Sequence, residues 1–178
     1  MLDQVIQVFL SDWSRTDTVR LLIELTPLFF PVVVWGVIPR LRKNGQALLI
    51  LFSLFTGFHA LFSSYELVLL SAETASRLAW PVSPFAVKLG FFHAAAGAGI
   101  LLCLLMGKTD WAKGLLAAMA LYAASSAVIH LFEAFAHNRI GPAHLGPTLM
   151  HDILFVFLAF WVLRKARGRG RAIYYVPQ

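Results

Sequence analysis

The sequence predicts an all-α integral membrane protein, and its composition carries that prediction. Of the 178 residues, 59% are hydrophobic and only 13% are charged, and the mean hydropathy is +0.73. A soluble domain of this size could not keep so much apolar surface away from water. Several apolar runs also approach the roughly 20 residues that a helix needs to cross a bilayer. We therefore expect a single transmembrane domain, a helical bundle over residues 1–178.

Five apolar runs separated by polar or turn-rich connections predict five transmembrane helices. They cover about 19–39, 46–70, 85–106, 114–136 and 148–163. Residues 1–18 place apolar side chains at helical spacing opposite polar ones, which is typical of a short amphipathic helix lying in the membrane interface. Residues 164–178 form a basic tail.

The basic residues predict the orientation of the bundle. Ten of the 15 lie on connections that five alternating spans place on one side: Arg40, Arg42, Lys43, Lys108, Lys113, Arg164, Lys165, Arg167, Arg169 and Arg171. The positive-inside rule makes that side cytoplasmic, so we expect the N-terminus outside and the C-terminus inside a plasma (inner) membrane. Topology also accounts for the net charge of +6 without a nucleic-acid partner.

Three ionisable residues mark the fourth span as the wall of a functional site. His130, Glu133 and His137 stand at positions i, i+3 and i+7, so they share one face of the predicted helix. Ionisable groups inside a membrane are costly unless they find partners or a ligand. At 1.5 Å per residue, His93 on the third span lies at about the same depth as His130.

The other spans add ionisable groups to the same outer half of the bundle. Glu24 is the only acidic residue of the first span, and His59 shares a face of the second span with Glu66. His151 and Asp152 open the fifth span. The pattern predicts one polar pocket that opens away from the cytoplasm.

Imidazole and carboxylate groups without thiolates favour a metal ion such as zinc, iron or copper. The single cysteine, Cys103, lies inside an apolar run and offers no thiolate cluster. The predicted metal ligands are His59, His93, His130, Glu133, His137 and His151. Glu66 or Asp152 could act as a general base in an enzyme whose substrate is a lipid or another hydrophobic molecule.

Other functions are compatible with the same residues. His93 and His130 at one depth on facing helices could bind a haem, and the small residues of 94–99 would let a flat cofactor approach. The polar groups could instead hydrogen-bond one another and hold the bundle together. In that case the chain would be an accessory or assembly subunit of a larger membrane complex, with a membrane-protein partner or a second copy of itself. The sequence leaves open whether the protein is an enzyme.

Overall fold

The computed structural model describes residues 15–72, 84–137 and 145–167, which form helices and short connections and contain no strand. The expected interfacial helix falls almost entirely outside these residues. The helices are α2 (Arg15–Val37), α3 (Pro39–Arg42), α4 (Gly45–Leu69), α6 (Pro84–Leu105), α7 (Thr109–Ala136) and α9 (Pro147–Arg167).

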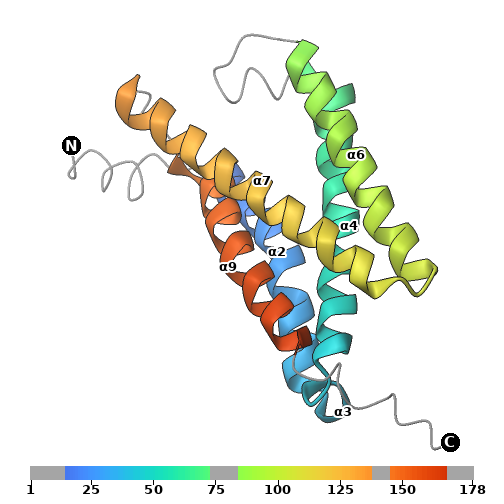
Figure 1. The fold of residues 1–178 in the computed structure, drawn as a ribbon. Helices are drawn as coiled ribbons and strands as arrows, with labels where there is room; N and C mark the ends of the chain where they lie inside the picture. The colour runs from blue at the N-terminus through green and yellow to red at the C-terminus, as the bar shows by residue number, and fades with distance from the viewer. Residues whose placement is uncertain (1–14, 73–83, 138–144, 168–178) are drawn as a thin grey trace, which may run out of the picture.

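Helix α4 lies at the centre of the bundle, since it contacts α2, α6, α7 and α9. Successive long helices run in opposite directions, and α4 and α6 form an extended antiparallel pair (Figure 1). Helix α9 packs between α7 and α2, which brings the end of the described chain back to its beginning. Segments far apart in the sequence therefore meet around α4.

Two helices extend beyond the apolar runs that predicted them. Helix α7 begins at Thr109 rather than near residue 114, because Asp110 in its first turn suits the positive end of the helix dipole. Lys113 Nζ donates to Asp110 Oδ1 over 2.8 Å and links the first two turns. Helix α9 continues through Arg167, and the basic residues of its last turn favour the helix C-terminus.

Small residues let α4 and α6 approach closely. A Cβ atom added at Gly97 would lie only 2.7 Å from the carbonyl oxygen of Gly57 and 3.1 Å from Ala60 Cβ. Both glycines and Ala60 are buried in the interface between the two helices. The Ala/Gly-rich run of the third predicted span therefore serves helix packing in this structure.

A hydrophobic core joins α2, α4, α6, α7 and α9. Phe52 of α4 is fully buried and stacks on Phe155 of α9, with ring centroids 5.9 Å apart. At the end of the core, Gln46 Nε2 donates to the carbonyl oxygen of Ala166. This contact fixes the start of α4 beside the end of α9.

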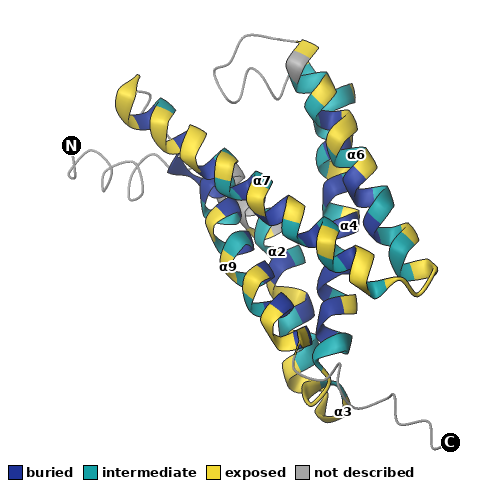
Figure 2. Cartoon of the chain, in the orientation of Figure 1, coloured by how far each residue is buried: buried dark blue, intermediate teal, exposed yellow. Residues whose placement is uncertain are grey.

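Three helices in the described part of the chain are long and apolar enough to cross a membrane: Gly45–Leu69, Ala86–Leu105 and Thr109–Ala136. Helix α2 has a shorter apolar stretch, Glu24–Val37. Large apolar side chains are exposed on the outward faces of the helices (Figure 2), as expected where lipid is the solvent. The count of five spans and the orientation stay predictions.

Candidate metal site

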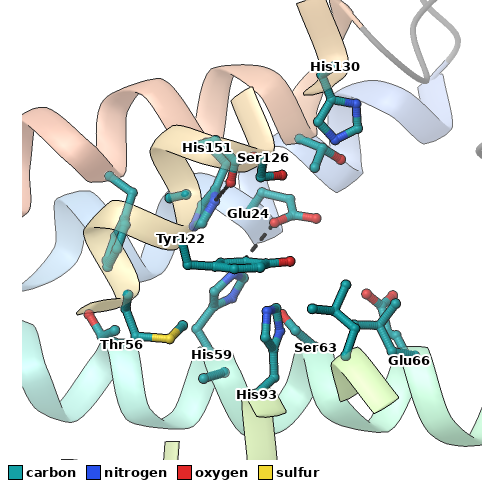
Figure 3. A pocket seen from close by; sticks show the side chains of 18 residues that line it. Glu24, Thr56, His59, Ser63, Glu66, His93, Tyr122, Ser126, His130 and His151 are labelled. Carbon is teal, nitrogen blue, oxygen red and sulfur yellow. Dashed lines mark hydrogen bonds and ion pairs between the residues drawn. The ribbon is translucent and has the colours of Figure 1, made fainter. Parts of the chain in front are cut away.

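A cavity of about 160 Å³ lies between α2, α4, α6, α7 and α9. All five helices contribute polar side chains to its wall (Figure 3). These polar residues are Glu24, Thr56, His59, Ser63, Glu66, His93, Tyr122, Ser126, His130, Thr148, His151 and Asp152. No lysine or arginine of the described residues lines it.

Three of these side chains offer ligand atoms close enough to share one metal ion. Glu24, His59 and His151 each place one nitrogen or oxygen atom within 4.8 Å of those of the other two. Glu24 Oε2 lies 3.6 Å from His59 Nε2, and the imidazole rings of His59 and His151 have centroids 4.7 Å apart. The side chains are 14%, 16% and 12% exposed, so water reaches them little.

The imidazole of His151 is held in place by its neighbours. Its ring stacks on Phe155 with centroids 5.9 Å apart and an interplanar angle of 10°. Its Nδ1 atom lies 3.4 Å from Asp152 Oδ1, and because a carboxylate can only accept, Nδ1 is the donor of this pair. The Nε2 atom is buried and has no hydrogen-bond partner among the described residues. A carboxylate on one imidazole nitrogen, with the other nitrogen free, is the usual arrangement of a metal-ligating histidine.

His93 lines the same cavity from α6 but lies outside the group of three. Both of its ring nitrogens are buried, and neither finds a hydrogen-bond partner in the described part of the chain. Its ring meets that of Tyr122 edge to face, with centroids 5.0 Å apart and an angle of 88°. Figure 3 shows His93 beside His59.

The structure brings most of the predicted site residues to this cavity but separates two of them. Its wall includes the predicted ligands His59, His93, His130 and His151, together with Glu66 and Asp152. His130 is 3% exposed and lies at the edge of the group, away from His59 (Figure 3).

The other two predicted ligands, Glu133 and His137, do not line the cavity. They contact each other at the end of α7, where His137 Nδ1 lies 3.4 Å from Glu133 Oε2 and the His137 side chain is half exposed.

Glu24 is the member of the group of three that the predicted ligand set lacks. Glu24 lies on α2, far along the chain from the histidines of α7 and α9, so spacing along one helix does not connect it with them. One signal could have identified it, since a lone carboxylate inside an apolar span is itself a mark of a functional site. Tyr122, whose ring contacts His93, carries no such signal, since buried tyrosines commonly pack in cores.

The donor set of Glu24, His59 and His151 fits a transition-metal ion or zinc. Two imidazoles and one carboxylate are the protein ligands of many catalytic zinc centres, and they also form the facial triad of non-haem iron enzymes. Both centre types leave coordination positions for an exogenous molecule.

No curated protein and no solved structure shows significant similarity to the chain. One family model matches residues 18–172, which include every residue of the described cavity. The chain therefore belongs to DUF6790, a family of unknown function.

Proposed function

We propose that this protein binds a metal ion inside its helical bundle through Glu24, His59 and His151. The observation that carries the proposal is the convergence of these three ligand atoms, within 4.8 Å of one another, from three different helices. The Nε2 atom of His151 is buried without a hydrogen-bond partner among the described residues. A bound cation would give this nitrogen a partner, with the ligand atoms of Glu24 and His59 within reach of the same ion.

The size of the cavity favours a metal ion over a haem. A cavity of about 150 Å³ accommodates one benzene ring, and the cavity here is about 160 Å³. A haem macrocycle consists of four linked pyrrole rings and would need the helices to move apart. Zinc, iron and copper all suit the donor set, since imidazole and carboxylate bind each of them.

We further propose that the metal has a chemical role on an uncharged or hydrophobic substrate. A structural zinc site is usually closed by four protein ligands, whereas a catalytic one keeps an open position. Asp152, a predicted general base, contacts His151 and would orient that ligand. Glu66 lines the cavity outside the group of three and is the better candidate for a base.

Metal analysis of the full-length protein, purified in detergent without chelators, tests the proposal. We expect stoichiometric zinc, iron or copper in the wild type. Glu24→Ala, His59→Ala and His151→Ala should each lose most of it, because three ligands are the minimum for tight binding in the sites described above. His137→Ala is the matched control and should keep its metal, because His137 is half exposed and lies outside the cavity.

A metal-free wild type would contradict the proposal. If that metal-free protein also co-purified with a stable membrane partner, the role of an accessory or assembly subunit would be favoured instead. Size-exclusion profiles matching the wild type would show that the variants fold.

A further inference from the structure

The proposed metal site leaves His93 unexplained, and this histidine points to a second binding element in the same cavity. Both ring nitrogens of His93 are buried without a hydrogen-bond partner in the described structure. A buried polar group in this state is less stable than one whose hydrogen bonds are satisfied. His93 lies outside the three-residue metal group, so the metal alone does not satisfy it.

The cavity has room for a molecule that contacts both the metal and His93. Its volume of about 160 Å³ exceeds what one metal ion needs. His93 lies beside His59 on the cavity wall (Figure 3), so an occupant of the open side of the metal would lie within reach of the His93 ring. Tyr122 meets the edge of the His93 ring and restricts its orientation.

The charges that face the cavity select the kind of occupant. Glu24, Glu66 and Asp152 line it, while no basic side chain of the described residues does. An anion that entered the cavity would lose its hydration without gaining a basic side chain among the described lining residues. An uncharged molecule that carries a nitrogen or oxygen donor has a smaller desolvation cost.

On these grounds we infer that the open side of the metal is a subsite for a small uncharged molecule, with His93 as its hydrogen-bond partner. The inference rests on the proposed metal site and names the chemical class that this site admits. The imidazole of His93 can donate from one nitrogen and accept at the other, so it can satisfy either kind of polar group. His93 is a binding residue for the occupant and not a ligand of the metal.

Cobalt(II) loaded into the full-length protein provides a spectroscopic test, because its visible absorption responds to a change of ligand. Imidazole serves as the uncharged probe and azide as the anionic one. In the wild type we expect imidazole to change the cobalt spectrum saturably and azide to bind more weakly. His93→Leu should keep its cobalt content and bind imidazole at least tenfold more weakly, while His93→Gln should retain part of the affinity through its amide.

A separate experimental result would contradict each part of the inference. A cobalt spectrum that imidazole does not change, or equal imidazole affinity in wild type and His93→Leu, would overturn the subsite. Loss of cobalt from both His93 variants in a folded state would make His93 a metal ligand, and tighter binding of azide than of imidazole would overturn the charge selection. Wild-type protein that binds no cobalt would contradict both the proposed function and the subsite that rests on it.

Discussion

The two imidazoles of the proposed metal site differ in how firmly their surroundings hold them. His151 is stacked on Phe155 and contacts Asp152, so its ring orientation is set before any ion binds. His59 contacts Glu24, which lies on another helix. The position of His59 relative to its co-ligands therefore depends on the packing of α2 against α4. In the proposed site, Asp152 would therefore position the ring of His151.

Replacement of that carboxylate should weaken metal binding without abolishing it. An outer carboxylate that accepts from a ligating histidine typically contributes a factor of about 10–100 in metal affinity. We expect Asp152→Asn to fall in this range in a competition titration against a chelator. Glu133→Gln is the matched control, because Glu133 contacts a histidine outside the cavity. Equal affinities for wild type and Asp152→Asn would show that Asp152 does not position His151.

At the scale of the elements, the site depends on how closely α4 can lie against its neighbours. Gly57 and Gly97 allow α4 and α6 to approach until a Cβ at Gly97 would lie 2.7 Å from a backbone oxygen. The same α6 carries His93, one turn before Gly97. The close contact between α4 and α6 therefore also determines where His93 lies in the cavity wall.

Adding a single methyl group at this interface should destabilise the bundle. In Gly97→Ala, the new Cβ meets backbone rather than a movable side chain, so we expect a loss of about 1–3 kcal/mol, the usual cost of overpacking. Gly114→Ala makes the same change in α7, where nothing lies within 4 Å, and should be neutral or stabilising by up to about 1 kcal/mol. Unfolding in detergent by heat or denaturant compares the two. A Gly97→Ala variant as stable as Gly114→Ala would contradict the packing described here.

At the scale of the whole molecule, the apolar runs predicted where the long helices lie, but they did not predict how these helices pack against one another. Apolar runs located the long helices to within a few residues, because the 3.6-residue repeat and the bilayer length act locally. The outer-half polar groups were also expected to share a pocket, and six of the predicted residues line one cavity.

The group of Glu24, His59 and His151 could not be predicted from spacing along one helix. Shared faces favoured His130 with Glu133 and His137, but spacing says nothing about which face of α7 meets which neighbour. Glu24, His59 and His151 belong to α2, α4 and α9, and they meet only because α9 returns to pack against both other helices. Such non-local contacts depend on side-chain packing throughout the bundle.

X-ray absorption on the zinc-loaded protein tests most directly whether a metal ion joins these three helices. The structure predicts a shell of nitrogen and oxygen ligands, with Zn–N distances of about 2.0–2.1 Å and scattering from two imidazoles. His59→Ala and His151→Ala should each leave one imidazole in that shell or bind no zinc. A wild-type shell with three or more imidazoles, or one unchanged in both variants, would contradict the account.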